Sequence, residues 1–288
     1  MQEKKVTLYP NFDEIEIDFR PELHNLFQQL SAGISEFTFA NLFLFRETHH
    51  YRISKLEENS YLIIGKDGKA NFFMLPFEIP DKSLLDEFFS NYGFMKAASE
   101  MQTELLKAFG YQVFEDRDNF DYVYLRSDLA RLAGRKFHKK KNLVNAFINN
   151  YSYQGKPLTE EYYQDAIQII EKWSQGRPDV GDAKAAREAI ENAELLQLCG
   201  CIYFVDGAPA AFTMGEELAN GESFVVHFEK ALNQYKGIYQ FINRCLALVL
   251  PKKYKFINRE QDLGNPGLRQ AKMSYRPVGF VKKYKVMP

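Results

Sequence analysis

This chain has few cysteines, and neither positive nor negative charge is in excess. Only three of its 288 residues are cysteine, namely Cys199, Cys201 and Cys245. An odd number with a Cys-x-Cys pair gives neither a disulfide framework nor a zinc-binding spacing. We therefore expect reduced cysteines in the core of a cytoplasmic protein, and no metal site. The formal net charge of −1 argues against a protein that is basic overall, but it allows a local basic patch.

Long hydrophobic runs are missing as well. The first residues, 1–5, are mostly polar and charged, and no apolar segment typical of a signal peptide follows them. The apolar stretch 195–205 is too short to span a bilayer and contains Gly200. We therefore expect neither a signal peptide nor a transmembrane segment. Hydrophobic residues nevertheless make up 45% of the chain, enough for the core of one large domain or two ordinary ones.

Two halves of the chain show the same order of patterns. Asp67-Gly68 and Asp206-Gly207 each lie between two apolar runs, which predicts a hairpin with a tight turn. A helical pattern and then a further strand follow each hairpin, at 122–125 and at 255–258. This order suggests a duplicated unit, divided near the turn formers at 149–157. We expect domains at 1–150 and 151–288, the second carrying the active site.

Helical patterns alternate with the predicted strands in the second half. Apolar residues at helical spacing predict helices over 158–175, 183–197 and 239–250. Strands that alternate with helices are typical of the α/β (α+β) class. We expect each half to be a mixed, twisted sheet flanked by helices.

A polar loop near the end of the chain is the most informative segment. The apolar run that ends at Ile257 is followed by Asn258, Arg259, Glu260, Gln261 and Asp262, and then by a turn rich in glycine and proline. Polar clusters positioned by a strand are where binding and catalysis usually occur. The alternative is a capped helix start, with Asp262 or Asn265 as the cap.

A second candidate segment begins with the strand pattern 224–230. Its alternation predicts Val226 and Phe228 on one face, and His227 and Glu229 together on the other. The chain then passes through Gln234, Lys236 and Gly237 into a helix, and a glycine turn before a helix can bind an anion. A plain helix entry explains the same residues.

The segment 128–148 predicts one long helix with a basic outer face. Its cations are Arg131, Arg135, Lys136, His138 when protonated, Lys139, Lys140 and Lys141. Like charges this dense repel one another, which an anion lying across them would relieve. The alternative is internal pairing with the acid-rich stretch 155–194.

The order of hairpin, strand, glycine turn, helix, strand and polar loop resembles the GCN5-related N-acetyltransferase (GNAT) fold. In that fold one strand splays from its neighbour and opens the acyl-donor cleft. Gln234 and Gly237 match the GNAT turn, whereas Tyr239 stands where a small residue is usual. The whole chain is similar to the family named for the C-terminal domain of phosphatidylglycerol lysyltransferase (DUF2156). These proteins are two fused GNAT-like halves related in fold to the Fem peptidyltransferases. The segments that carry this resemblance are 39–46, 134–143, 236–240 and 256–283.

This resemblance implies transfer of an aminoacyl group from aminoacyl-tRNA to a lipid headgroup, a peptide or a small molecule. The site residues it suggests have distinct roles. They are Glu229 or His227 as the base and Tyr275 as the acid; Glu260 or Asp262 for a cationic amino group, beside Asn258 and Gln261; Arg269 and Lys272 for phosphate or carboxylate; Gln234, Lys236 and Gly237 for the donor; and Arg135, Lys136, Lys139, Lys140 and Lys141 for tRNA. Two alternatives remain: a non-catalytic binding protein on the same scaffold, and a CoA-dependent N-acyltransferase acting on a small amine.

Overall fold

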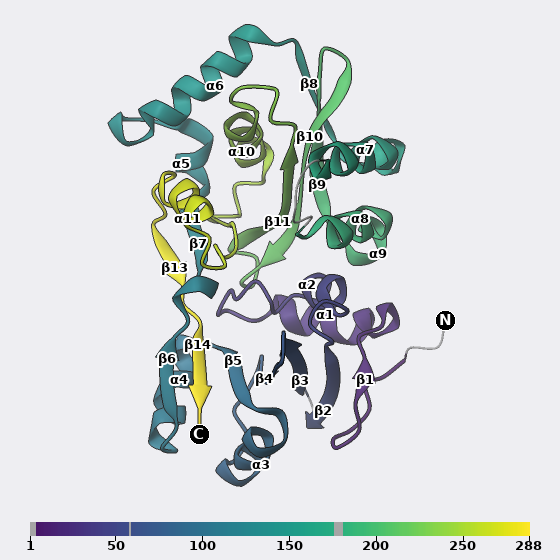
Figure 1. The fold of residues 1–288 in the computed structure, drawn as a ribbon, viewed down its shortest axis with the longest axis vertical. Coiled ribbons are helices and arrows are strands. Elements are labelled where there is room, and N and C mark those ends of the chain that lie inside the picture. Colours follow the sequence, from purple (N-terminus) through teal and green to yellow (C-terminus); the bar gives the residue numbers. More distant parts are fainter. Residues whose placement is uncertain (1–3, 58, 176–180) are drawn as a thin grey trace.

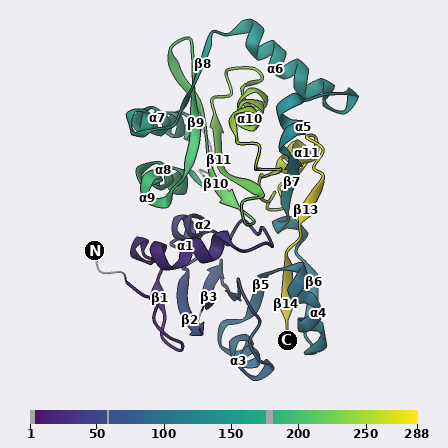
Figure 2. The same ribbon diagram turned by 180° about the vertical axis from the view of Figure 1, so that it is seen from behind.

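The computed structural model describes residues 4–57, 59–175 and 181–288. It contains two seven-stranded mixed sheets (Figures 1 and 2). The first has the strand order β1 (Asp13–Glu14), β2 (Arg52–Glu57), β3 (Ser60–Asp67), β4 (Ala70–Met74), β5 (Phe94–Ala98), β14 (Tyr284–Met287), β6 (Gln112–Glu115). The second has the order β13 (Gly279–Val281), β7 (Asp121–Leu125), β12 (Phe256–Asn258), β11 (Ser223–Ala231), β10 (Ala208–Leu218), β9 (Cys199–Val205), β8 (Tyr153–Pro157).

Helices cover both faces of each sheet. The helices of the first half of the chain are α1 (Arg20–Gln28), α2 (Phe39–Phe45), α3 (Lys82–Tyr92), α4 (Glu100–Ala108), α5 (Arg126–Arg131) and α6 (His138–Asn150). Those of the second half are α7 (Tyr163–Ser174), α8 (Ala183–Glu191), α9 (Ala193–Leu196), α10 (Ile238–Val249) and α11 (Pro266–Met273). One continuous apolar core joins α1 and α2 to α7 and α8, so the two sheets share a central layer of helices (Figure 1).

The two sheets exchange strands across the predicted boundary at residue 150. β7 precedes that boundary but lies between β13 and β12 of the second sheet, whereas β14, at the chain end, lies between β5 and β6 of the first. α5 and α6 also pack on α10 of the second half. The predicted division at residue 150 therefore does not follow the division between the sheets, because strand pairing here joins residues far apart in sequence.

Both halves contain a three-stranded meander, a helix and a parallel strand. In the first half these are β2 to β4, α3 and β5; in the second they are β9 to β11, α10 and β12. Asp67-Gly68 joins the second and third strands of its meander, whereas Asp206-Gly207 joins the first and second. Both hairpins form as predicted, but they are not equivalent positions of the repeat.

Three further predictions on local structure need correction. The helix predicted over 128–148 is broken, because Leu132 has a φ of +46° and Gly134 a φ of +82°, and a 3-10 turn at 135–137 leads into α6. The helix predicted over 183–197 is divided at Asn192 into α8 and α9. Cys199 is exposed, and the other two cysteines are partly exposed and unpaired, so they are not core residues.

Candidate functional site

The candidate site lies where β11 and β12 separate. These parallel strands pair only from Ser223 with Phe256 to Val225 with Asn258, and β11 continues for six residues beyond that point. At the matching end of the first sheet, the Gln102 amide donates to the carbonyls of Leu75 and Phe77, both at 2.9 Å. The divergence of β11 from β12 that the GNAT resemblance implies is therefore present in the second half, and the region between the diverging strands, with the side chains in it, is called the opening below.

A β-bulge in β11 decides which side chains line each face of the opening. Phe228 pairs with Met214 and Val226 pairs with Gly215, so His227 is an extra residue without a partner on β10. A bulge shifts the alternation by one residue. Val226 consequently packs in the core on the α10 side, whereas Phe228 packs in the core that contains α7 and α8. The predicted common face of His227 and Glu229 is therefore wrong.

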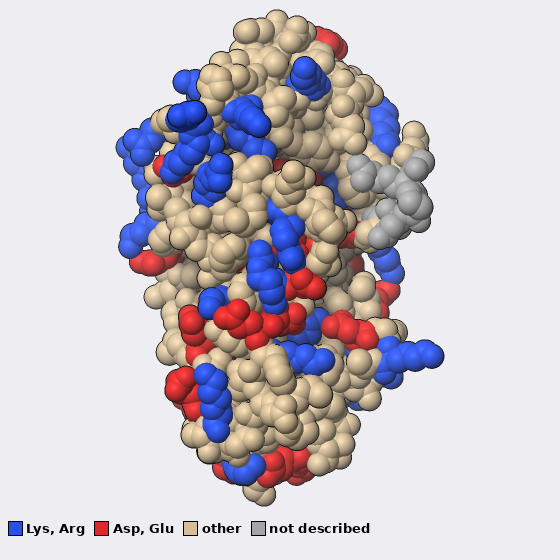
Figure 3. Space-filling model, turned by 60° about the vertical axis from the view of Figure 1, so that its left-hand side comes forward, with Lys and Arg blue, Asp and Glu red and all other residues tan. Residues whose placement is uncertain are grey.

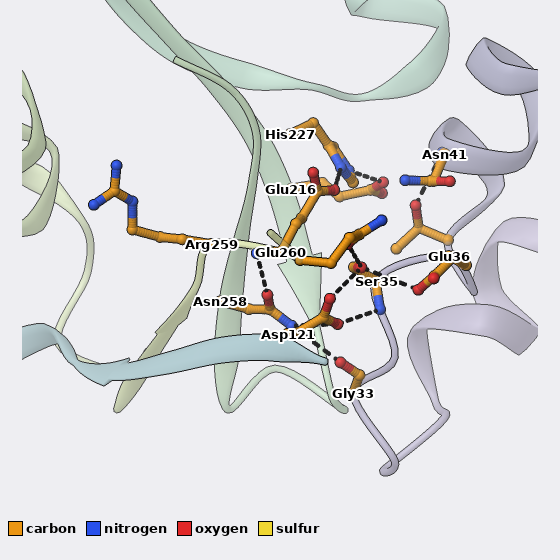
Figure 4. Close-up of polar contacts among 12 residues, drawn as sticks. Gly33, Ser35, Glu36, Asn41, Asp121, Glu216, His227, Asn258, Arg259 and Glu260 are labelled. Atoms are coloured by element: carbon orange, nitrogen blue, oxygen red, sulfur yellow. Dashed lines mark hydrogen bonds and ion pairs between the residues drawn. The ribbon is translucent and has the colours of Figure 1, made fainter. Parts of the chain in front are cut away.

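On the α7 side, His227 is held between two carboxylates (Figure 4). Its Nδ1 lies 2.8 Å from Oε1 of Glu260, and its Nε2 lies 3.0 Å from Oε1 of Glu216. Burial alone would lower the pKa of His227, but the hydrogen bonds to both carboxylates outweigh it and raise the pKa to about 10. The imidazolium form is the stable one at neutral pH, so the prediction of His227 as a general base does not fit this geometry.

On the α10 side, Arg259 bridges the opening. Its guanidinium donates to Oε1 of Glu229 at 2.7 Å, and its Cζ lies 5.1 Å from the ring centroid of Tyr275. Asn243 of α10 reaches the second oxygen of Glu229 at 3.5 Å. Burial, opposed by the charge of Arg259, raises the pKa of the Tyr275 hydroxyl to about 12, so the phenol keeps its proton at neutral pH.

A buried charge cluster holds the base of the polar loop (Figure 4). Lys283 contacts Asp121 at 2.7 Å and also pairs with Glu36, and all three side chains are at most 7% exposed. The Asn258 amide donates to Asp121 and to the Gly33 carbonyl, both at 3.1 Å. Its own oxygen accepts from the Glu260 backbone N–H at 2.8 Å. Asn258 therefore positions Glu260 and is not free to bind a substrate.

Gln261 lies beside the same cluster, with its side-chain oxygen 3.4 Å from the Ser35 hydroxyl oxygen. Ser35 itself donates from its backbone N–H and its hydroxyl to Asp121, both at 2.9 Å. The predicted ligand Gln261 thus belongs to the contact between the α1–α2 loop and the polar loop.

The remaining predicted ligands of the loop serve its folding. Asp262 is fully buried and accepts from the Tyr122 hydroxyl at 2.6 Å, from the Gly264 N–H at 2.9 Å and from two nitrogens of Arg269 at 2.9 and 2.7 Å. These bonds outweigh burial and hold the pKa of Asp262 well below its usual range. With their hydrogen bonds satisfied inside the protein, Asp262 and Arg269 do not fit the predicted role in substrate binding.

Lys272 fixes the backbone of the same loop. Its ammonium donates to the carbonyls of Arg259, Glu260 and Gln261 at 2.6, 3.1 and 2.5 Å. Burial and the charge of Arg259 lower its pKa to about 8, yet three carbonyl acceptors call for all three protons of the ammonium. The alternative of a capped helix start also holds, because Asn265 accepts from the Leu268 N–H at the start of α11.

The glycine turn is packed against α6. Gly237 has a φ of +87°, and a Cβ there would lie 2.2 Å from the Leu143 carbonyl oxygen. Gln234 and Lys236 are exposed at the surface. The Tyr239 hydroxyl contacts the backbone of Ala231, at the end of β11. The α6 backbone therefore packs directly against the turn that the GNAT resemblance assigns to the donor.

The basic segment forms an exposed surface over α6 and the turn before it. Lys and Arg side chains gather there with little acidic surface among them (Figure 3). The exposed cations at its centre are Arg135, Lys136, Lys139 and Lys141. Lys136 pairs with Asp128 at 2.8 Å. Among the described residues of 155–194, Glu188 pairs with Arg46 and Asp182 with Lys230, and no acidic residue there forms an ion pair with the basic segment.

The sequence comparison decides the family. The family described as "Phosphatidylglycerol lysyltransferase, C-terminal" matches residues 27–287. The chain belongs to this family. Membership in the lysyltransferase C-terminal family confirms the resemblance inferred from the motifs, and it supports a transferase of acyl or aminoacyl type.

Solved structures confirm the fold of this family member. A conserved protein of unknown function from Bacteroides thetaiotaomicron is 31% identical, with a TM-score of 0.86 over 96% of this chain and 98% of that one. L-PGS from Bacillus licheniformis has 16% identity and a TM-score of 0.66 over 99% of this chain and 94% of that one. FemX has 8% identity and a TM-score of 0.58 over 96% of each chain. Because L-PGS and FemX have such low sequence identity to this chain, their similarity shows only the shared tandem GNAT-like fold.

One curated relative is an uncharacterized protein from Mycoplasmoides gallisepticum, 24% identical over 184 residues. The match covers 60% of this chain and 57% of that protein, so the chain spans little more than half the length of this relative. Among the described residues, no helix is long and apolar enough to cross a membrane. Within the same residues, no group of three His, Cys, Asp or Glu side chains is arranged to hold a metal ion.

Several residues of this family member escaped prediction. Glu216 lies in an apolar strand pattern, Lys283 lies in a lysine-rich segment near the chain end, and Asp121 directly precedes the predicted strand 122–125. Arg259 was visible in the polar loop, but its partner across the opening depends on the bulge. A glutamate within an apolar strand is the signal that could have pointed to Glu216, because such a charge must find a partner.

Proposed function

We propose that this protein transfers an aminoacyl group from an activated donor to an amine or hydroxyl acceptor at the opening between β11 and β12. The observation that carries the proposal is the set Glu229, Arg259 and Tyr275 on the α10 side of the opening. Acyl transfer needs a positively charged or hydrogen-bond-donating group that stabilises the developing oxyanion, and an acid that protonates the leaving group.

Each of these residues has a role that fits its surroundings. The Arg259 guanidinium is fixed by Glu229 and can stabilise the oxyanion of the tetrahedral intermediate. Tyr275 keeps its proton and can donate it to the leaving oxygen. Glu229, predicted as a base, is tied to Arg259 and orients it instead. Glu260 pairs with His227 through one oxygen, and its side chain is 18% exposed, so it can attract a cationic amino group of the donor.

Aminoacyl-tRNA suits the surface better than acyl-CoA as the donor. The exposed cations of α6 can contact phosphates, and Lys140 of the same helix reaches the ring of Tyr275. The α6 backbone packs directly against the glycine turn, which argues against a CoA pyrophosphate at that turn. The acceptor is a lipid headgroup, a peptide or a small molecule that carries an amine or hydroxyl group.

The reaction can be tested with tRNA charged with radiolabelled amino acids, with phosphatidylglycerol vesicles, peptides and small amines as separate acceptors. We expect Tyr275→Phe and Glu229→Gln to lower the transfer rate by a factor of about 10² or more. Tyr254→Phe is the matched control, since its hydroxyl binds Glu217 away from the opening. Full activity in both site variants would remove this assignment.

Donor binding is a separate prediction. Reversing the charge of Lys139 and Lys141 should weaken tRNA binding strongly at low salt and reduce the salt dependence of the affinity. Lys184→Glu, at an exposed lysine of α8, is the control and should leave tRNA affinity nearly unchanged. Unaltered affinity in the α6 variant would exclude tRNA docking there, and stabilisation by acyl-CoA alone would favour a CoA-dependent enzyme.

A non-catalytic binding protein is the second candidate. The observation in its favour is that ion pairs bridge both faces of the opening, Glu229 with Arg259 and His227 with Glu260. Binding of aminoacyl-tRNA without transfer to any acceptor class would support it.

A further inference from the structure

Lys140 differs from the other cations of α6 in where its side chain lies. Lys139 and Lys141 are exposed, whereas Lys140 is partly buried, with its Nζ 4.0 Å from the ring centroid of Tyr275. Neighbouring residues of an α-helix project about 100° apart, so one lysine of the run can point inward while its neighbours face solvent. Lys140 therefore belongs to the opening between β11 and β12 as well as to the basic helix.

The other candidate bases at this opening are already engaged. Both ring nitrogens of His227 contact carboxylates, and the stable form of its ring is the cation. Glu229 is in an ion pair with Arg259. Lys272, which lies behind the loop, donates to three backbone carbonyls. Within the described residues, no carboxylate lies within ion-pair distance of Lys140, which leaves its amine available for proton transfer.

We infer that Lys140 is the proton acceptor for the attacking nucleophile, working with Tyr275 as the proton donor to the leaving group. The inference rests on the proposed acyl transfer and adds to it the residue that activates the acceptor. It also separates Lys140 from Lys139 and Lys141, which keep the docking role.

The electrostatic surroundings of Lys140 suit this role. Burial and then the positive charge of Arg259 lower its pKa to about 8. At pH 7 the Lys140 amine is then neutral in about a tenth of the molecules, and this fraction rises with pH. The charged and titratable groups of the neighbouring elements are Tyr275 after α11, Arg259 after β12 with Glu229 on β11, and Arg244 on α10, which donates to the Ala130 carbonyl. On its own segment the charged and titratable groups are Asp128, Arg131, Arg135, Lys136, His138, Lys139 and Lys141.

The step balances without any further reactant. The acceptor nitrogen or oxygen bonds to the ester carbonyl carbon, the carbonyl oxygen takes the electron pair, and the nucleophile's proton passes to the Lys140 Nζ. Collapse of the intermediate breaks the bond to the ribose oxygen, which takes the proton of the Tyr275 hydroxyl. The Lys140 ammonium then returns a proton to the phenolate, and both groups regain their starting state.

The test compares Lys140→Met and Lys140→Arg in the charged-tRNA transfer assay across pH 6 to 9.5. We expect wild-type turnover to rise with pH and to level off above about pH 8, and both variants to lose about 100-fold in kcat together with this pH dependence. Arginine keeps the positive charge but cannot give up its proton, so it separates proton transfer from charge. Lys141→Met should raise the KM for charged tRNA and keep the pH profile. Lys107→Met, on α4, should match the wild type.

The outcomes separate this inference from the proposed function. Wild-type turnover in Lys140→Arg, or an unchanged pH profile in Lys140→Met, overturns the role of Lys140 and leaves acyl transfer intact. A wild-type protein that transfers no aminoacyl group to any acceptor class overturns both. A normal circular dichroism spectrum and normal tRNA affinity in the two Lys140 variants would show that lost turnover does not come from misfolding or from weaker docking.

Discussion

At the scale of single residues, the charged side chains of the polar loop mostly hold the loop itself. Asp262 and Lys272 were predicted as ligands because polar residues at the end of a strand often bind substrates. In the structure each is surrounded by partners from the same loop, from β7 or from α11. A buried charge needs such partners, since burial without them costs several kcal/mol. Arg259 and Glu260 differ in that their partners, Glu229 and His227, lie across the opening on β11.

The first prediction concerns Asp262→Asn. The substitution removes the charge that pairs with Arg269, and it turns an NH2 donor toward groups that themselves donate. We expect a loss of about 2 kcal/mol in the free energy of unfolding, below the full value for a buried pair because Arg269 is 36% exposed. Asp118→Asn is the control; it contacts the same Arg269 but is 60% exposed, so a loss within about 0.5 kcal/mol is expected. Equal urea midpoints for both variants would contradict this view of Asp262.

His227 supplies a prediction on pH. Its folded-state pKa, about 10, is raised above the usual value of 6.5, so the folded protein holds its proton more tightly than the unfolded chain does. The resulting stability is complete below about pH 6.5 and is lost as the pH rises toward 10. We expect the free energy of unfolding to fall over this range in the wild type and to fall much less in His227→Gln. His138→Gln, at an exposed histidine of α6, should keep the wild-type slope.

At the scale of elements, sequence patterns predicted what depends on neighbouring residues. The hairpins at Asp67-Gly68 and Asp206-Gly207, and α10, follow from turn chemistry and periodicity, which act over a few positions. The bulge at His227 could not be predicted, because it is defined by the pairing of β11 with β10. That one residue moved Glu229 to the opposite face from His227 and changed which side chains share the site.

The contact of α10 with α6 gives a prediction at this scale. In Gly237→Ala the new Cβ would meet the Leu143 carbonyl at 2.2 Å, in a left-handed backbone conformation. We expect a loss of at least about 3 kcal/mol, since overpacking adds to the cost of the positive φ. Gly207→Ala is the matched control, with a φ of +81° but no heavy atom within 4 Å, and should lose about 1 kcal/mol. Equal thermal shifts in the two variants would show that α6 does not pack on this turn.

At the scale of the whole molecule, the polar loop is supported by both halves of the chain. β14 returns to the first sheet after β13 has paired in the second, and Lys283 lies on the segment between them. From there it reaches Glu36 of the first half and Asp121 at the start of β7. The sequence predicted two similar α/β halves but not this exchange of strands. β7 pairs with β12, which lies more than 130 residues further along the chain, and no local pattern indicates such a pairing. The candidate site therefore depends on contacts that no local pattern specifies.

The last prediction tests this connection with a double-mutant cycle. Lys283→Met leaves Glu36 and Asp121 buried without their cation, so we expect a loss of about 3–5 kcal/mol in the free energy of unfolding. Adding Glu36→Gln removes one of the two uncompensated charges and should restore at least about 1 kcal/mol, which is the sign of direct coupling. Lys282→Met is the adjacent control; its partner Glu115 is 52% exposed, and a change within about 0.5 kcal/mol is expected. If Lys283→Met were as mild as this control, or if the second substitution only added to the loss, the cluster would not be what joins the two sheets beneath the site.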